Sequence, residues 1–199
     1  MADDKRGRDK QAHDADIRQR ERAIETELSR GDEPAPPLKL TELSAVAAEL
    51  EALKFPVTGA EIVATIGDRE LSTEEGNYTI EELLPATDEE TFDSSPAVEA
   101  QIQRPTIAVA MKRVVEATKS ARITDFSYSQ RKAYEKTFEA LKVIDAVDND
   151  EGIEVMTDWI LEQISEEGRL PTSRNVRREA VKYCRANGYQ VRNDEWLGI

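Results

Sequence analysis

Histidine and cysteine are almost missing from this 199-residue chain, which holds His13 and Cys184 and no other residue of either type. A single cysteine excludes a disulfide within the chain. One histidine and one distant cysteine also fall short of the four nitrogen or sulfur ligands that a usual zinc site requires. Histidine is the usual supplier of proton transfer near neutral pH. We therefore expect no enzyme activity, no catalytic residue, no cofactor, no metal site and no small-molecule substrate.

Long apolar runs are also absent, and none approaches the roughly 18 residues that a membrane span needs. The start, Met1-Ala2-Asp3-Asp4, has neither the basic residues nor the apolar core of a signal peptide. Hydrophobic residues make up only 39% of the chain and charged residues 34%, which is typical of a heavily solvated surface. These features predict a soluble, cytoplasmic protein that does not contact a membrane.

Lysine is scarce beside the acidic residues. The chain has 41 Asp and Glu against 27 Lys and Arg, and only 10 of those 27 are lysines, so its formal net charge is −14. Added Asp and Glu promote solubility more than added Lys does, and a cytosol crowded with salt would favour such a surface. We interpret the composition as that of a protein from a salt-in halophile. An ordinary acidic protein from a mesophile is the alternative.

The first 30 residues have the composition of a charged arm, with eight acidic and eight basic side chains. Ile17, Ile24 and Leu28 would fall on one stripe of a helix, which would gain order by lying on another surface. A solvated and partly disordered arm is the alternative. Three prolines within residues 31–37 end the arm and predict an extended linker.

Residues 38–95 have the pattern of a small α+β domain. Apolar residues spaced three and four apart predict a first helix. Thr58 and Thr79 each stand three residues before a glutamate, which is the spacing of a capping box and predicts the start of two further helices. Between them, residues 69–72 and 77–80 predict two short strands joined by a turn.

Three segments of this domain form recognisable motifs, namely residues 55–61 (FPVTGAE), 67–71 (GDREL) and 78–84 (YTIEELL). They resemble a small domain of unknown function that recurs in haloarchaeal proteins. The stretch from Arg104 through the ending NDEWLG at 193–198 is similar to uncharacterised acidic proteins of the same group. The shared motifs consist of turn and cap residues, which specify a fold and not a chemistry. The resemblance implies a halophilic archaeal origin and brings no activity, cofactor or catalytic residue with it.

Residues 96–199 predict a helical domain, so that the whole chain belongs to a mostly helical α+β class. Pro96 and Pro105 are placed to occupy the first turns of two helices. Tyr134 and Phe138 stand at helical spacing within an apolar pattern. We interpret these two aromatic residues as part of a core, not as a platform for stacking nucleic-acid bases.

An acidic cluster, Asp145, Asp148, Asp150 and Glu151, precedes the next helix. Such a cluster is consistent with a Mg²⁺ or Ca²⁺ site because these ions prefer oxygen ligands. The position of Gly152 does not match the Ca²⁺-loop template, however. We interpret the cluster as acidic residues that complement the positive end of the helix dipole. Carboxylates are too numerous elsewhere for spacing to single out a catalytic pair, and that alternative stays open.

The last 31 residues are net basic, in contrast to the acidic chain as a whole. From residue 169 to residue 199, seven basic residues face three acidic ones, a balance of +4 in a chain of −14. Pro171, Thr172 and Ser173 predict a helix start and Gly188 a stop, which gives a helix over residues 173–187. At about 100° per residue, one side of this helix is basic. The opposite side carries Val176, Ala180, Tyr183 and Cys184. The candidate partner-binding residues are Arg174, Arg177, Arg178, Lys182 and Arg185.

Three interpretations of this basic helix remain. Its arginines would dock on carboxylates of the chain's own body, of another acidic protein or of a second copy, because guanidinium groups bind carboxylates in two-pronged fashion. Alternatively, residues 153–187 form a helix-turn-helix-like reader of nucleic acid, although the turn is longer than that motif prefers. A solvated face without a partner is the third. We expect a binding or adaptor protein that docks an acidic protein partner, with nucleic acid as the alternative.

Overall fold

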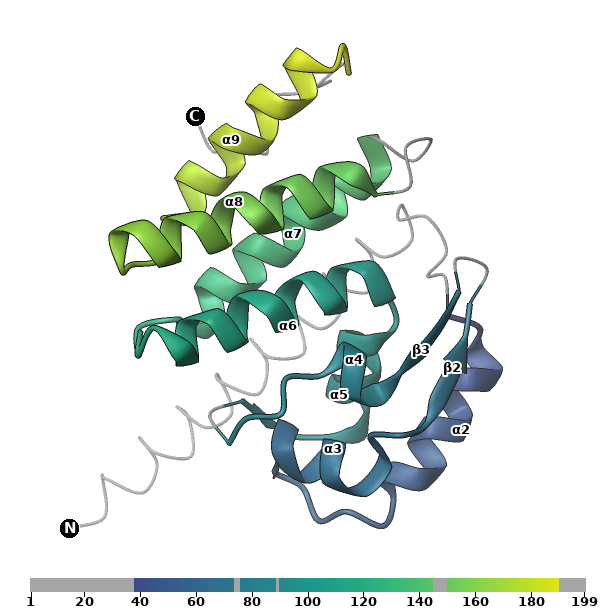
Figure 1. The fold of residues 1–199 in the computed structure, drawn as a ribbon. Coiled ribbons are helices and arrows are strands. Elements are labelled where there is room, and N and C mark those ends of the chain that lie inside the picture. Colours follow the sequence, from purple (N-terminus) through teal and green to yellow (C-terminus); the bar gives the residue numbers. More distant parts are fainter. Residues whose placement is uncertain (1–37, 74–75, 89, 145–149, 190–199) are drawn as a thin grey trace, which may run out of the picture. The chain divides into compact units, whose positions relative to one another are not determined.

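The structure is a computed structural model that describes residues 38–73, 76–88, 90–144 and 150–189. The predicted arm (1–30) and linker (31–37) lie outside the described residues, as does the ending at 193–198. The mostly helical α+β class predicted from the sequence is confirmed (Figure 1). Among the helices in the described ranges, none combines the length and the apolar character that crossing a membrane demands.

Short helices and strands alternate in the first part of the described chain. They are α2 (Leu40–Leu50), β1 (Val57–Thr58), α3 (Gly59–Ile66), β2 (Glu70–Ser72), β3 (Asn77–Thr79), α4 (Ile80–Leu83), β4 (Thr91–Phe92) and α5 (Ser95–Ile102). Both predicted capping boxes are confirmed. At the first, Thr58 Oγ1 accepts from the Glu61 amide (3.2 Å) and the Glu61 carboxylate accepts from the Thr58 amide (2.8 Å). Thr79 and Glu82 make the same pair of bonds.

Two small antiparallel sheets accompany these helices. The predicted hairpin is confirmed as β2 and β3, in which Leu71 lies opposite Tyr78. The second sheet, β1 with β4, pairs Val57 with Phe92 and was not predicted. Its strands are two residues long, which is too short to show the alternation that identifies a strand in a sequence.

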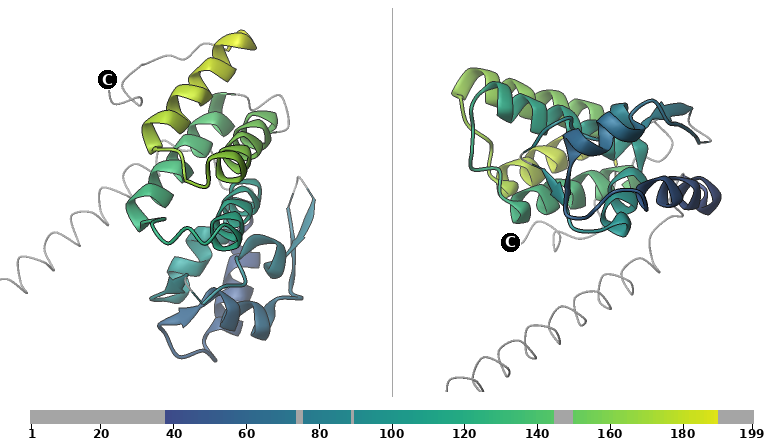
Figure 2. Two further views of the ribbon diagram at one scale, coloured as in Figure 1. Left: turned by 60° about the vertical axis from the view of Figure 1, so that its left-hand side comes forward. Right: turned by 90° about the horizontal axis from the view of Figure 1, so that it is seen from below.

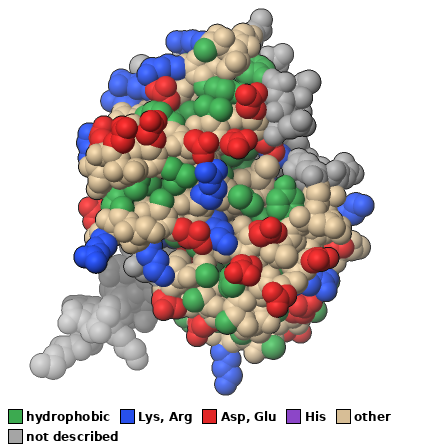
Figure 3. Space-filling model, viewed as in Figure 1, with side chains coloured by type: hydrophobic (Ala, Val, Ile, Leu, Met, Phe, Trp, Pro, Cys, Tyr) green, Lys and Arg blue, Asp and Glu red, His purple; other side chains and the backbone are tan. Residues whose placement is uncertain are grey.

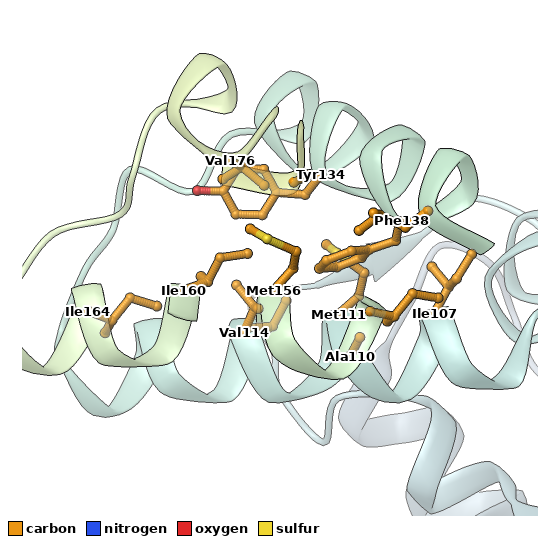
Figure 4. Close-up of a cluster of buried hydrophobic side chains, with 14 of the residues drawn as sticks. Ile107, Ala110, Met111, Val114, Tyr134, Phe138, Met156, Ile160, Ile164 and Val176 are labelled. Carbon is orange, nitrogen blue, oxygen red and sulfur yellow. The ribbon is translucent and has the colours of Figure 1, made fainter. Parts of the chain in front are cut away.

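Four longer helices complete the chain: α6 (Pro105–Ser120), α7 (Tyr128–Ile144), α8 (Glu151–Glu167) and α9 (Ser173–Ala186). Their apolar sides meet in one core, to which α6, α7, α8 and α9 all contribute (Figure 4). Tyr134 and Phe138 are fully buried there, as the sequence predicted. Burial of such large side chains removes much apolar surface from water and stabilises the helical layer.

The start of α6 belongs to two cores. Ile107 is buried in the core of the long helices, whereas its neighbour Ala108 is buried in a second core formed by residues 38–102. Helix α6 therefore lies between the α4–α5 region and helices α7 and α8, in contact with both (Figure 2). The predicted domain boundary between residues 95 and 96 stays a prediction. Helix α5, which begins at this boundary, packs in the core of the preceding elements.

Candidate interaction surface on the C-terminal helix pair

The turn before α9 is fixed to α7 by the carbonyl oxygen of Pro171. The Tyr134 hydroxyl donates a hydrogen bond to this oxygen, and the Gln130 side-chain amide donates a second one at 2.9 Å. Gly168, with φ of 63°, ends α8 in the left-handed conformation that glycine adopts without strain. Thr172 then caps α9, since its Oγ1 accepts from the Asn175 amide at 3.3 Å.

Helix α9 packs on α7 and α8 through one apolar side. Val176, Ala180 and Cys184 are fully buried on it, as the sequence predicted, and Tyr183 is half-buried. Cys184 is thus a buried thiol, which behaves as a small apolar group. Packing on this side fixes the rotation of the helix and so determines which residues face solvent.

The outer side of α9 is basic. Four of the five candidate residues are exposed, and the fifth, Arg177, is half-buried with its Nε 3.4 Å from the Ser173 carbonyl oxygen. We call the four exposed residues the basic stripe: Arg174, Arg178, Lys182 and Arg185. Figure 3 shows basic side chains along the upper edge of the molecule, over α9. The structure therefore places the predicted residues together on one exposed face, with Arg177 at its margin.

The cations of the basic stripe differ in their surroundings. Lys182 pairs with Glu179 of the same helix, at 2.6 Å between Nζ and Oε2. Within the described residues, by contrast, Arg174 and Arg178 make no hydrogen bond or ion pair through their guanidinium groups.

A complementary feature of α8 escaped the sequence analysis. Its exposed side carries five carboxylates at spacings of three and four, which we call the acidic stripe: Glu151, Glu154, Asp158, Glu162 and Glu166. Asp158 binds Arg113 of α6 at 2.7 Å. The other four make no ion pair within the part of the chain that the structure describes. Their spacing was the signal in the sequence, but acidic residues are so frequent in the chain that it did not stand out.

Helices α8 and α9 have the order of a helix-turn-helix pair but a longer connection. Residues 168–172 separate the end of α8 at Glu167 from the start of α9 at Ser173. This turn of five residues exceeds the three or four that are typical of the DNA-reading motif. The nucleic-acid interpretation therefore gains no geometric support from the turn.

The predicted acidic cluster before α8 lies only partly within the described residues, since Asp145 and Asp148 fall outside them. Asp150 and Glu151 stand at the N-cap and in the first turn of α8, where the interpretation as residues that complement the helix dipole places them. The Asp150 carboxylate also binds Lys142 of α7 at 2.6 Å and caps no amide. Among the described residues, no group of three or more His, Cys, Asp or Glu side chains is arranged to hold a metal ion.

A groove between α6 and α8 runs beside the acidic stripe. Its volume is about 220 Å³, below the roughly 300–1,000 Å³ of most small-molecule sites. Arg113 and Asp150 line it, and each is already paired with another side chain of the protein. The groove thus offers few polar groups that are not already engaged.

Glu90 forms a partly buried ion pair that the sequence did not reveal. Its Oε1 lies 3.2 Å from Nη1 of Arg131 on α7, and its Oε2 is buried without a hydrogen-bond partner within the described residues. Burial raises the pKa of Glu90 above its ordinary value, since the cost of desolvation and the nearby Glu135 outweigh the attraction of Arg131 and Lys132. The partners are about 40 residues apart in the chain, so no local pattern predicts the pair.

The Glu90 ion pair leads to a prediction on pH. Between the ordinary pKa of 4.5 and the raised one, the folded protein binds more protons at Glu90 than the unfolded chain does. The free energy of unfolding therefore contains a component that falls as pH rises through this window. Denaturant titrations of the wild type and of Glu90→Gln across that range measure the component as their difference. Glu166→Gln serves as the control for loss of one charge, and a difference that rises with pH would contradict the assignment.

The N-cap of α9 leads to a second prediction. Thr172→Ala removes the oxygen that accepts from Asn175 and is expected to lower the free energy of unfolding by about 1 kcal/mol. Thr172→Ser keeps the oxygen and should retain most of the stability. Urea denaturation followed by circular dichroism measures both, and equal stabilities of the two variants would show that the cap does not hold the helix.

Comparison with known proteins covers the first part of this architecture. Residues 40–114 match the model of a family described as "Family of unknown function (DUF5789)". The match contains the motifs at 55–61, 67–71 and 78–84, and it ends within α6, before the helices that carry the two stripes. No match was found among curated proteins, and none among solved structures. The predicted resemblance to a small domain of unknown function is therefore confirmed for residues 40–114.

Proposed function

We propose that this chain is a non-enzymatic binding or adaptor protein whose basic stripe docks an acidic surface of a protein partner. The observation that carries the proposal is the state of Arg174 and Arg178, which are exposed and make no ion pair within the described residues. Both stand on a helix whose other side is buried in the core. Unpaired guanidinium groups on a fixed helix are suited to recognition.

Arginine chemistry favours a carboxylate partner. The planar guanidinium group presents two parallel N–H donors that match the two oxygens of Asp or Glu. Arg174 and Arg178 are one helical turn apart, so their contacts repeat at about 6 Å along the helix. A partner helix with carboxylates at spacing four would present its charges at the same repeat.

Nucleic acid is the second candidate, favoured by the exposed cations alone. The chain's net charge of −14 opposes it, since most of the surface would repel a polyanion. Strong salt also weakens phosphate contacts, because the entropy gained when counterions are released falls as the bulk salt concentration rises. Protein docking is therefore the proposed function.

A haloarchaeal origin and a cytoplasmic location are part of the proposal. The acid excess, the scarcity of lysine and the motifs at 55–61, 67–71 and 78–84 support them. A protein adapted to strong salt is expected to unfold at a higher temperature in multimolar KCl than in dilute buffer. Thermal unfolding at both salt levels provides the measurement, and equal unfolding temperatures would count against the origin.

The docking surface is tested by titrating fluorescent probes with the protein. One probe is a glutamate-rich peptide, and the other is a DNA or RNA duplex. The double variant Arg174→Ala/Arg178→Ala should bind the peptide about 3- to 30-fold more weakly than the wild type, from roughly 0.3–1 kcal/mol for each exposed pair.

Lys54→Ala/Lys119→Ala is the matched control, because it removes the same charge from exposed positions elsewhere. It should bind the peptide nearly as well as the wild type. Equal losses in both double variants would point to a general charge effect and overturn the docking surface. Duplex binding with a steep salt dependence that the arginine variant reduces would favour the nucleic-acid function instead.

A further inference from the structure

We propose that the acidic partner is a second copy of this chain, and that the basic stripe of α9 in one copy docks onto the acidic stripe of α8 in the next. The inference rests on the proposed function and names the partner of the same surface. It starts from the presence, in one molecule, of two exposed stripes of opposite charge with unused charged groups on each.

The two stripes match in spacing and length. The basic stripe has spacings of four, four and three residues, and the acidic stripe has spacings of three, four, four and four. At a rise of about 1.5 Å per residue, the eleven steps from Arg174 to Arg185 span about 16 Å, and the fifteen steps from Glu151 to Glu166 span about 22 Å. Two helices laid side by side would therefore place cations against carboxylates once in each turn over the whole basic stripe.

An apolar side chain lies among the carboxylates of the acidic stripe. Val155 is 41% exposed although it belongs to a helix that is otherwise apolar only on its buried side. The aliphatic stem of an arginine covers apolar surface while its guanidinium group stays at the edge. An arginine of the basic stripe can thus cover Val155 and still bind Glu154. This contact would resist salt, which screens exposed charges within a few ångströms at high concentration.

The two stripes do not neutralise one another within a copy. Helices α8 and α9 pack together through their buried sides, where Ile160 and Val176 meet the common core. Their exposed stripes consequently point away from that contact. Arg174, Arg178, Glu154 and Glu162 make no ion pair within the described residues, so each stripe keeps two such groups for an outside partner.

The proposed contact joins two different surfaces, α9 of one copy and α8 of the next, so the copies associate head to tail. Each copy would use its α9 toward one neighbour and its α8 toward another, so that the interface is heterologous. Such an interface closes into a ring or continues as a chain, according to the rotation between neighbours. The apparent mass in solution should accordingly rise with protein concentration and fall with added salt.

Charge reversal on each helix separately gives the decisive experiment. The full chain is prepared as an α9 variant, Arg174→Glu/Arg178→Glu, and as an α8 variant, Glu162→Arg/Glu166→Arg. All four positions are exposed, and arginines near the end of α8 suit the negative end of its dipole. Circular dichroism establishes that both variants fold, and light scattering after size-exclusion chromatography measures their masses.

The wild type is expected to associate, and each variant alone is expected to be monomeric because like charges face one another at its interface. An equimolar mixture of the two variants should associate again, since each reversed helix then meets an oppositely charged one. Val155→Ser should weaken wild-type association most clearly at high salt. This restoration by mixing would not occur if the reversed residues merely destabilised the fold.

A monomeric wild type at low salt and high concentration, or a mixture that stays monomeric, would overturn self-association. The titration with the glutamate-rich peptide distinguishes failure of self-association from failure of the docking function. If the peptide still requires Arg174 and Arg178 while the wild type is monomeric, the docking function stands and its partner is another acidic protein. If neither the peptide nor a second copy binds, both proposals fail.

Discussion

Replacement of Phe138 by alanine is expected to lower the free energy of unfolding by about 3–5 kcal/mol. Phe138 is fully buried on α7, where its ring lies among Met111, Ile107 and neighbouring side chains (Figure 4). Truncation removes the buried ring and leaves a cavity that the surrounding helices fill only partly. The loss would be a large fraction of the free energy of unfolding of a whole domain, which is typically about 5–15 kcal/mol.

Val143→Ala supplies the control for this prediction. Val143 lies on the same helix but is 56% exposed, so its truncation should change stability by about 0.5 kcal/mol or less. Guanidinium denaturation followed by circular dichroism compares the two variants. Similar stabilities of Phe138→Ala and Val143→Ala would mean that the core of the long helices is not packed as described.

Gly59→Ala is the second substitution with a large expected effect. A Cβ atom at this position would lie 2.3 Å from the backbone oxygen of Pro85. The close approach is fixed by hydrogen bonds from Gly59 N to the Glu90 oxygen (2.9 Å) and from Ala60 N to the Thr87 oxygen (3.2 Å). Because backbone cannot move aside as a flexible side chain can, we expect a loss of about 1–3 kcal/mol.

Ala64→Val tests whether added volume alone is harmful. Ala64 is exposed on the same helix, α3, and the substitution adds more atoms than Gly59→Ala does. Its cost should be about 0.5 kcal/mol, from helix propensity. If Gly59→Ala were as stable as Ala64→Val, the contact between α3 and the 85–87 loop would be looser than the structure shows.

Together, the Gly59 and Phe138 variants test the predicted division at residue 95. Phe138 belongs to the core of the long helices, whereas Gly59 lies on α3, whose Ile62 and Ile66 belong to the other core. Helix α6 contributes Ala108 to one core and Ile107 to the other. A helix shared in this way should couple the cores, so that both variants shift one common unfolding transition. Two separate transitions, each moved by one variant, would instead support independent domains.

Local chemistry explains which parts of the fold were predictable. The capping boxes at Thr58 and Thr79 involve residues three apart, and the β2–β3 hairpin pairs two strands that lie close together in the sequence. The buried side of α9 follows from a spacing of three and four. Each of these signals is complete within one element, and each is confirmed.

Features that join distant segments were not predictable from one sequence. The β1–β4 pairing connects residues 57–58 with 91–92, and the Glu90–Arg131 pair connects a loop with α7. Asp150, the N-cap of α8, also binds Lys142 on α7. No period or motif encodes these contacts, since they depend on how complete elements pack.

The candidate surface was half predictable. The basic stripe stood out because its sign opposes that of the chain, and the structure brings its residues together on one exposed face. The acidic stripe has an equally regular spacing but no such contrast with the chain's average composition. A regular spacing of charged residues therefore stands out only where their sign is opposite to the net charge of the chain. The acidic stripe has the same sign as the chain and was missed for this reason.

The carbonyl oxygen of Pro171, which accepts from both Tyr134 and Gln130, has a consequence for the thermodynamics of association. It anchors the start of α9 to a neighbouring helix, so in the proposed complex the arginines would meet the partner already aligned. Little chain entropy is then lost when the complex forms, and the heat-capacity change should reflect only the contact area, without the larger signature of a segment that folds upon binding.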